Sequence, residues 1–182
     1  TSIQLPLLPL IKEKLIKTNN IIIDSKSGYS GAGKNIKNKF NFKNLLNSVS
    51  AYGVGHHKHM AEIDQEVKKI TGKNIKISFT PHLIPMFRGI LSTIYLETSK
   101  KSNAYKVYKF LKKYHKKNYF VKIKKFNTPI STGSVVNTNF CNISVCKTRK
   151  KNQIIIISTI DNLIKGASGQ AVQNMNLAFK FN

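Results

Sequence analysis

Hydrophobic residues recur at helical spacing in four stretches of the chain. Steps of three or four residues put each set on one face of a helix. The stretches are marked by Leu5, Leu8, Ile11 and Leu15, by Met60, Ile63, Val67 and Ile70, by Val107, Tyr108, Leu111 and Tyr114, and by Val172, Met175 and Phe179. Gly72 follows the second stretch and suits the C-terminal cap of a helix. The pattern therefore predicts four amphipathic helices.

Between these stretches the pattern changes to apolar runs and to alternation with a period of two, which indicates strands. We expect strands at 21–23, 75–79, 90–98, 119–124, 135–145 and 153–158, and a short strand or loop at 52–57. The last two strands flank a charged turn at 149–152, as in a hairpin. This order predicts an α+β fold, with an antiparallel or mixed sheet that carries its helices on one face. Because 182 residues can bury one good core, we expect a single domain over 1–182.

The sequence is strongly basic, with a formal net charge of +24 and a pI of about 10.2. Such a charge favours nucleic acid as a partner. However, only Arg88 and Arg149 supply a guanidinium, and the lysines are spread from Lys12 to Lys180, which is typical of a compositional bias at tolerant surface positions. We therefore expect no specific nucleic-acid partner and only weak, salt-sensitive binding to polyanions. A basic nucleic-acid-binding module is the alternative function.

No apolar run reaches membrane-spanning length, and nothing at the start resembles a signal peptide. These features lead us to expect a cytoplasmic protein without a membrane partner. Cys141 and Cys146 fall in one predicted strand, where their spacing puts them on opposite faces. We expect both to be small strand residues rather than a disulfide or a chelating pair.

Three of the five histidines, His56, His57 and His59, lie in the segment 51–63 together with Glu62. Because an imidazole accepts or donates a proton near neutral pH, one interpretation is a general acid–base site. A metal site is a weaker interpretation, since the spacing matches no zinc motif and Lys58 would repel a cation. A solvated, His-rich turn is equally compatible with these residues alone.

Three other segments carry possible chemistry. Gly28 to Lys34 fit part of a phosphate-binding P-loop, but Asn35 replaces the hydroxyl that would bind Mg²⁺. A glycine loop whose backbone N–H groups face another anion or a cofactor, or a plain turn, are the alternatives. The loop predicted at 79–89 presents Arg88, which suits a bidentate grip on a carboxylate or phosphate, or an ordinary salt bridge. The small residues at 166–169 allow close backbone approach at the start of the last helix.

Four segments, taken in this order, resemble one family: 27–33 (SGYSGAG), 57–63 (HKHMAEI), 79–89 (FTPHLIPMFRG) and 161–173 (DNLIKGASGQAVQ). They are similar to the C-terminal, catalytic portion of N-acetyl-γ-glutamyl-phosphate reductases, NADPH enzymes of arginine biosynthesis. Aspartate-semialdehyde and glyceraldehyde-3-phosphate dehydrogenases have related folds. The family's usual His-Arg-His is His57-Lys58-His59 here, and Ala61 replaces its usual proline.

The resemblance implies a mechanism for the complete enzyme, in which a thiolate displaces phosphate from an acyl phosphate and NADPH reduces the resulting thioester. It also implies roles for residues of this chain. His57 would be the base, and Tyr52, His59 and Arg88 would bind the small-molecule substrate. The residues expected near NADP(H) are Ser27, Gly28, Ser30, Gly31, Asn162 and Gln170. No metal is implied.

One departure concerns the nucleophile. The family's cysteine lies in a Gly-Cys-Tyr-Pro-Thr segment, and this chain begins as though cut directly after that proline. Cys141 and Cys146 do not occupy its place, and no glycine fingerprint of a dinucleotide-binding half is present. We therefore expect an incomplete enzyme that is inactive alone, whose C-terminal helix at about 162–180 packs against the missing half. The complete enzyme is expected to be a homo-oligomer.

Overall fold

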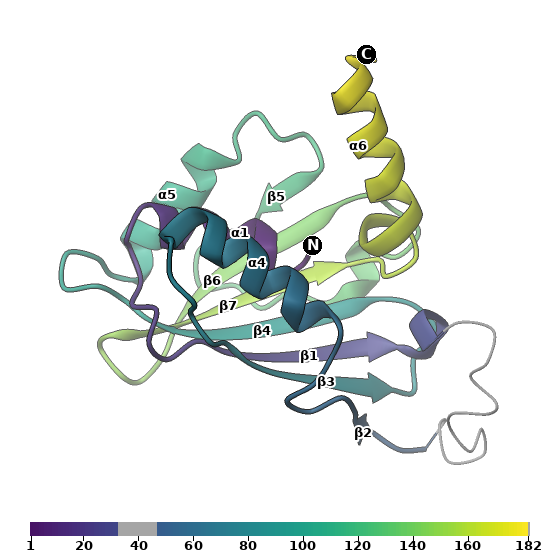
Figure 1. Cartoon of the computed structure of the whole chain (residues 1–182), viewed down its shortest axis with the longest axis horizontal. Helices are drawn as coiled ribbons and strands as arrows, with labels where there is room; N and C mark the ends of the chain where they lie inside the picture. The colour runs from purple at the N-terminus through teal and green to yellow at the C-terminus, as the bar shows by residue number, and fades with distance from the viewer. Residues whose placement is uncertain (33–46, 182) are drawn as a thin grey trace.

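Seven strands form one mixed sheet in the order β2-β3-β1-β4-β7-β6-β5 in the computed structural model, which describes residues 1–32 and 47–181 (Figure 1). The strands are β1 (Ile22–Gly28), β2 (Ser50–Ala51), β3 (Ser78–Ile84), β4 (Ile90–Glu97), β5 (Val121–Ile123), β6 (Cys141–Lys147) and β7 (Gln153–Ile160). β1 pairs with β3, and β5 with β6, in parallel. The other neighbours are antiparallel.

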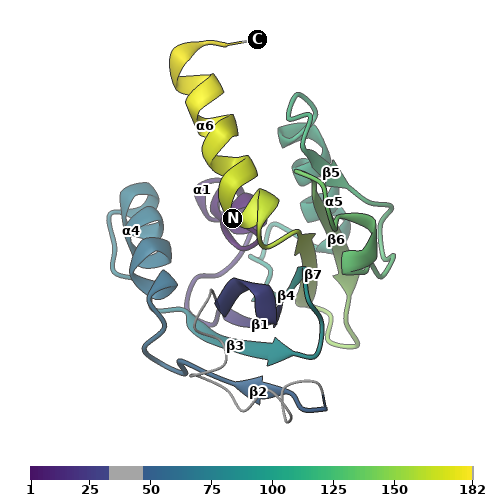
Figure 2. The same cartoon turned by 90° about the vertical axis from the view of Figure 1, so that its right-hand side faces the viewer.

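Helices cover one face of this sheet. The α-helices are α1 (Gln4–Lys12), α4 (His59–Thr71), α5 (Ala104–Tyr114) and α6 (Gly169–Phe179). Figure 2 shows α1, α4 and α5 on the same side of the strands, whereas α6 projects away from the end of β7. Short 3₁₀ turns occur at Tyr29–Ala32 and Thr132–Ser134, and a π-helical turn at Ile164–Ser168 precedes α6. The predicted α+β class, with a mixed sheet and helices on one face, is confirmed.

The core lies between the sheet and α1, α4 and α5. Alternate residues of the strands face it, so that β4 buries Ile94 and Leu96 and β7 buries Ile154 and Ile156. The helices contribute buried residues at helical spacing, namely Leu7, Leu10, Ile63, Val67, Val107 and Leu111. Removing each such side chain from water stabilises the fold by about 1.5–3 kcal/mol, so burial of this helical stripe holds the helices to the sheet.

Two strands are longer than the sequence pattern predicts. β1 continues to Gly28, beyond the strand predicted at 21–23, and β3 continues to Ile84, so the loop predicted at 79–89 begins later than expected. Pro81 falls inside β3 although proline cannot donate to a sheet ladder. It is tolerated because β2 pairs only with His82 and Leu83, and the Pro81 carbonyl accepts from Tyr52 N–H at 3.1 Å. Gly33 and Lys34 lie outside the described residues.

The predicted strand at 135–145 starts late. Residues 132–138 form turns instead, in which Val135 and Val136 N–H donate to the Thr132 carbonyl and Asn137 adopts a left-handed φ of 63°. Pairing begins only at Cys141, opposite Ile160 of β7. The predicted hairpin between the last two strands is confirmed. None of the described helices has the length and apolar character needed to cross a membrane.

Candidate functional site

A cavity of about 700 Å³ lies where the first residues of α1, the end of β1, the start of α4 and the turn after β7 meet. Its lining includes eight residues that the sequence singled out: Ser27, Gly28, Ser30, Gly31, Tyr52, His57, His59 and Asn162. It also includes Thr1, Lys58, Glu62, Gly166 and Ala167. Segments far apart in the sequence thus converge on one hollow.

The histidine segment is a turn rather than a strand. β2 ends at Ala51, and the His56 N–H donates to the Gly53 carbonyl at 3.1 Å before α4 begins at His59. Gly53 has a φ of 58°, and a Cβ there would lie 3.2 Å from Cδ2 of His57. The glycine therefore lets the turn close against the imidazole.

His57 lies in the cavity wall, and His56 does not. The His57 ring packs edge-on against Phe79 and Tyr52, with centroids 5.4 and 5.5 Å away, and against His59 at 4.8 Å. His56 is exposed, and its Nδ1 lies 2.9 Å from the Val54 carbonyl. The turn therefore separates these two neighbours.

The hydrogen bond of His57 selects a tautomer. The backbone N–H of His59 donates to Nδ1 of His57 at 3.2 Å, so the neutral ring carries its proton on Nε2. Partial burial, with smaller contributions from His59 and Lys58, lowers the pKa of His57 below its usual value. The ring is therefore neutral at pH 7 and offers an Nε2–H donor.

Glu62 and Tyr52 complete this wall. Glu62 raises the pKa of His59, although burial is the larger effect and lowers it overall. Burial raises the pKa of the Tyr52 phenol, so Tyr52 is a proton-bearing donor at neutral pH. The sequence pointed to Glu62 only as a possible metal ligand. The signal that it shares a site with His59 is their spacing of three on α4, which puts both on one side of the helix.

The glycine segment is built for packing, not for holding an anion with its amides. Gly28, Tyr29 and Ser30 N–H donate to the carbonyls of Gly89, Met86 and Phe87 at 2.9–3.1 Å. A Cβ on Gly28 would lie 2.6 Å from the Phe87 carbonyl oxygen. These three N–H groups are therefore not free to face an anion or cofactor, because carbonyls already accept from them, and the role of the rest of the segment stays a prediction.

The Asn162 side chain links the same loops by hydrogen bonds. Its Oδ1 accepts from Gly89 N–H at 2.7 Å, and its Nδ2 donates to Ser30 Oγ at 2.9 Å. The side chain is 7% exposed and lines the cavity. A Cβ on Gly31 would lie 3.3 Å from Nδ2 of Asn162, which accounts for a glycine at this contact.

Arg88 does not line the cavity, and its predicted role in substrate binding stays a prediction. Its guanidinium donates to Asp161 Oδ1 and to Asn137 Oδ1, at 3.0 and 2.7 Å. The salt-bridge interpretation is therefore the one that the contacts support. An arginine already paired with a carboxylate has little capacity left for a substrate anion.

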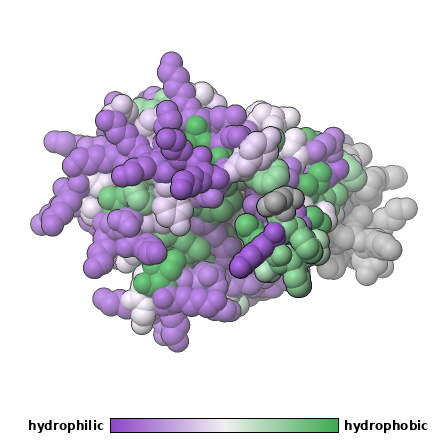
Figure 3. All heavy atoms as spheres, turned by 90° about the horizontal axis from the view of Figure 1, so that it is seen from above, coloured by the Kyte–Doolittle hydropathy of each residue, from purple (hydrophilic) through white to green (hydrophobic). Residues whose placement is uncertain are grey.

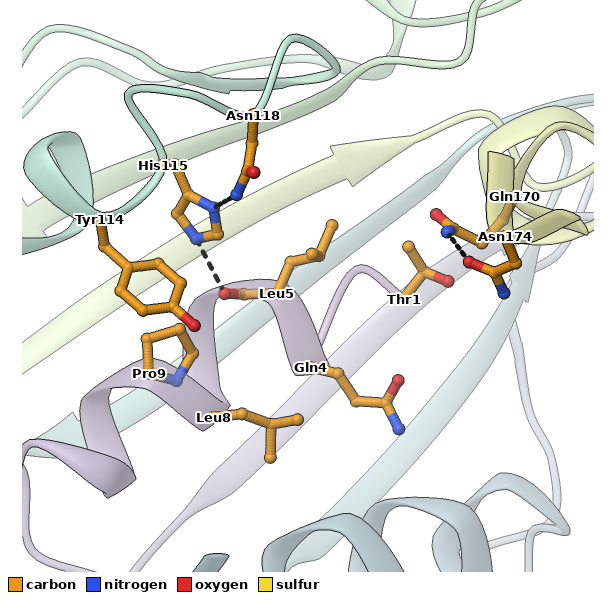
Figure 4. A pocket seen from close by; sticks show the side chains of 10 residues that line it. All are labelled: Thr1, Gln4, Leu5, Leu8, Pro9, Tyr114, His115, Asn118, Gln170 and Asn174. Atoms are coloured by element: carbon orange, nitrogen blue, oxygen red, sulfur yellow. Dashed lines mark hydrogen bonds between the residues drawn. The ribbon is translucent and has the colours of Figure 1, made fainter. Parts of the chain in front are cut away.

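Gln170 lies in a second hollow of about 440 Å³ between α1, α5 and α6 (Figure 4). Its Nε2 donates to Asn174 Oδ1 at 2.7 Å, within α6. Thr1 and Gln4 line both hollows. The structure therefore places Gln170 near the first cavity but not in it, and Asn162 and Gln170 do not meet.

The cysteines are not nucleophiles of this site. Cys141 is fully buried, and burial raises the pKa of its thiol to about 11. Cys146 is half-buried near the Ser144 hydroxyl, and neither cysteine forms a disulfide. Within 1–32 and 47–181, no group of three or more His, Cys, Asp or Glu residues is arranged to hold a metal ion.

Comparisons with known proteins identify the family and the fold. Residues 1–162 match the family model described as "Semialdehyde dehydrogenase, dimerisation domain". The chain is 46% identical over 181 residues to an N-acetyl-gamma-glutamyl-phosphate reductase of Afipia carboxidovorans and 41% identical to one of Staphylococcus aureus. Both matches cover 100% of this chain but 51% and 53% of those proteins, so the chain spans about half the length of these relatives.

Solved structures show the same fold at low sequence identity. Aspartate semialdehyde dehydrogenase II from Vibrio cholerae matches with a TM-score of 0.72 at 18% identity, covering 100% of this chain and 60% of that one. The enzyme from Francisella tularensis matches with a TM-score of 0.74 at 14% identity, covering 97% and 62%. The resemblance to N-acetyl-γ-glutamyl-phosphate reductases seen in the four segments is confirmed, and the chain belongs to the semialdehyde dehydrogenase dimerisation-domain family.

Proposed function

We propose that this chain is the C-terminal, catalytic part of a cytoplasmic NADPH-dependent reductase of arginine biosynthesis. The reaction would convert N-acetyl-glutamyl phosphate to N-acetyl-glutamate semialdehyde and phosphate. The observation that carries this proposal is the cavity, which gathers His57, His59, Tyr52 and Glu62 beside Thr1. The homologous reductases support the same reaction.

The cavity residues suit work on an acyl group attached to sulfur. We assign His57 to the reacting atoms through Nε2–H, which would hydrogen-bond a thiolate or the oxygen of a tetrahedral intermediate. The role of base, implied by the family resemblance, requires a free Nε2, and therefore the loss of the bond from His59 N–H to Nδ1. Tyr52 and His59 are assigned to substrate; burial lowers the pKa of His59, and the Glu62 carboxylate only partly opposes this.

The nucleophile would come from outside this chain. A thiolate needs a lowered pKa and access to substrate, whereas Cys141 has neither. Thr1 lines the cavity, so residues that precede it in a longer chain would enter the site beside His57. We propose that such residues supply the sulfur and that the chain alone does not catalyse the reaction.

The described residues do not form a complete site for NADPH. The N–H groups of Gly28, Tyr29 and Ser30 donate to carbonyls, and the amide oxygen and nitrogen of the Asn162 side chain each form a hydrogen bond within the protein. The dinucleotide therefore finds no pyrophosphate cradle here. We propose that the other half of the reductase binds NADPH, and that Ser27, Gly31 and Asn162 bound the space for it rather than hold it.

The exposed helix α6 is the surface on which we place that other half. No residue of α6 is buried, although Val172, Met175 and Phe179 are apolar and lie three or four residues apart. These side chains are 54%, 46% and 68% exposed. A dinucleotide-binding half packed on α6 and around Thr1 would cover them and would close the hollow that contains Gln170.

We also propose that two copies pair through the uncovered face of the sheet, as the description of the matched family suggests. Ile22, Tyr95 and Ile155 are cross-strand neighbours that form a row across this face. Ile22 is 43% exposed. Burial of such a row against a second copy would remove apolar surface from water.

The test joins this chain to the half of the Afipia carboxidovorans reductase that it does not cover. NADPH oxidation with N-acetyl-glutamyl phosphate is measured for the chain alone and for the joined protein. We expect turnover only in the joined protein. Turnover by the chain alone would contradict the external nucleophile, and a folded, NADPH-binding joined protein without turnover would contradict the proposed reaction.

A further inference from the structure

Acidic residues are absent from one long stretch of the sequence. No aspartate or glutamate occurs between Glu97 and Asp161, a stretch that forms α5, β5, β6 and β7 (Figure 1). Figure 3 shows hydrophilic side chains dominating the side on which α5 lies. The charge of the lysines in this stretch is therefore not offset from within the stretch, because the carboxylates belong to other parts of the sequence.

Among the residues that the structure describes, the lysines of this stretch form no close ion pair with a carboxylate, although the charge of Lys150 helps to lower the pKa of Glu97. The ion pairs of the described residues involve Lys17, Lys26, Lys69, His82 and Arg88, and none of these residues lies between 98 and 160. Exposed lysines without a counter-charge keep their full attraction for an anion, apart from screening by salt.

Aromatic rings accompany these lysines. Tyr105, Tyr108 and Phe126 contact one another, with ring centroids 5.3–5.9 Å apart. Each ring has its own ammonium group: Lys109 is 4.8 Å from the Tyr105 centroid, Lys112 is 5.9 Å from that of Tyr108, and Lys147 is 5.7 Å from that of Phe126. A second lysine–aromatic pair lies toward the opposite end of β6, where Lys122 is 4.7 Å from the Tyr119 centroid and Tyr119 contacts Phe140.

Two of these rings are open to solvent. Tyr105 is 49% exposed and Tyr119 is 69% exposed. We call the surface formed by Tyr105, Tyr108, Lys109, Lys112, Phe126 and Lys147 the α5 face. It combines uncompensated ammonium groups with aromatic faces at short distances, which is the combination that single-stranded nucleic acids bind.

We propose that the α5 face binds single-stranded nucleic acid without regard to sequence, with lysines on the phosphates and the exposed Tyr105 stacked on a base. Sequence independence follows from the chemistry, because lysine is a point charge and every base has a face on which a ring can stack. This activity is separate from the proposed reductase reaction, since no residue of the α5 face lines the first cavity.

An anionic membrane is a poorer fit to the same charge. Membrane-surface helices insert aliphatic side chains between lipids. The large hydrophobic residues exposed on or beside the α5 face are tyrosines, whereas Val172, Met175 and Leu177 are exposed on α6. The buried side of α5, with Val107 and Leu111, is already packed in the core.

The test measures fluorescence anisotropy of a labelled oligo(dT) of about 20 nucleotides with the 182-residue chain, between about 50 and 200 mM salt. One triple variant is Lys109→Gln, Lys112→Gln and Lys147→Gln. The matched control is Lys68→Gln, Lys73→Gln and Lys76→Gln, which removes the same charge from exposed sites on and after α4. Circular dichroism confirms that each variant is folded.

We expect the α5 triple variant to weaken binding about tenfold or more and to lower the slope of log K against log salt by roughly 2, since each lost phosphate contact removes about 0.7. The control should change binding less than about threefold. Tyr105→Leu should weaken binding about fivefold with an unchanged slope. Equal loss in both triples, no binding at the lowest salt, or preferential binding of phosphatidylserine vesicles over oligo(dT) would overturn the proposal.

Discussion

Arg88 and Asp161 form a buried ion pair that links the loop after β3 to the turn after β7. Nη2 of Arg88 donates to Oδ1 of Asp161 at 3.0 Å, and Nε lies 3.0 Å from Oδ2 without the alignment of a hydrogen bond. The Asp161 side chain is 0% exposed. Burial opposes its ionisation, but N–H donors from Asn137, Ile164 and Leu163, together with Arg88, lower the pKa of Asp161 overall.

Breaking this pair should destabilise the fold more than breaking an exposed one. In Arg88→Met, the buried Asp161 carboxylate loses its counter-charge, which costs about 3–5 kcal/mol. The control is Lys26→Met, which removes a pair with Asp24 at 2.6 Å that is about one-third exposed on both sides. That loss should stay below about 1 kcal/mol. Urea unfolding followed by circular dichroism measures both, and equal losses would contradict the structural role of Arg88.

The sequence predicts the order of elements well because helix and strand periods differ. It predicts element ends poorly where tertiary contacts decide them. β1 runs through polar Asp24 and Lys26 because both neighbouring strands pair with it, and β3 runs through Pro81 because its edge is nearly free there. Neither reason is visible in a local pattern.

The candidate site shows the same contrast between residues that the sequence points to and contacts that only the fold decides. The family resemblance located His57, His59, Tyr52 and Asn162, which converge on the cavity. The partner of Arg88, however, is Asp161, at a sequence separation of 73 residues. A single sequence gives no signal for such a contact. The short spacing from His59 to Glu62 was readable, but only the cavity shows that it joins a site rather than a solvated helix turn.

Substitutions at His57 should separate a donor role from a base role in the joined reductase. His57→Asn should lower kcat by about 10² to 10⁴ with the fold intact. His57→Gln keeps an N–H donor close to the position of Nε2, so it should retain more activity than His57→Asn if His57 acts as a donor. An equal loss of kcat in both variants would favour the role of His57 as a base.

The neighbouring histidines provide controls for that experiment. His56→Asn should leave kcat within a few-fold, because His56 is exposed and lines no part of the cavity. His59→Asn should act mainly through KM, as expected for a residue that binds substrate. Steady-state kinetics with circular dichroism measures all variants. Near-normal kcat in His57→Asn would exclude His57 from the chemistry.

The fold should lose stability as the pH falls, partly through His115. Its Nε2 lies 3.1 Å from the Leu5 carbonyl and its Nδ1 2.9 Å from Asn118 Nδ2, so the buried ring is satisfied as the neutral form. Burial lowers the pKa of His115, despite the opposing bond to Leu5. The unfolded chain therefore binds this proton first, and stability is full above about pH 6.5 and decreases below it.

Urea unfolding at about pH 7.5 and 5.5 tests this sign. One histidine contributes at most about 1.4 kcal/mol at one pH unit below its unfolded pKa. His115→Gln keeps a donor for the Leu5 carbonyl and should reduce the loss at low pH, whereas the exposed His56→Gln should not. His57 and His59, whose pKa values are also lowered mainly by burial, would account for part of the remaining loss. An unchanged pH dependence in His115→Gln would contradict the assignment.

The outer face of the sheet should mediate pairing of two copies. Ile22→Lys puts a charge into the row formed with Tyr95 and Ile155, so an interface there would have to bury an unpaired ammonium group. Ile70→Lys on α4 is the matched control, since Ile70 is 36% exposed and Ile22 is 43% exposed. Both variants replace a similarly exposed isoleucine with the same charge.

A stable pair would bury roughly 800 Å² on each copy. Analytical ultracentrifugation should therefore find a dimer for the unmodified chain and for Ile70→Lys, and a monomer for Ile22→Lys at the same concentration. A dimer that survives Ile22→Lys would locate the contact elsewhere, and a monomeric unmodified chain would contradict pairing through this half alone.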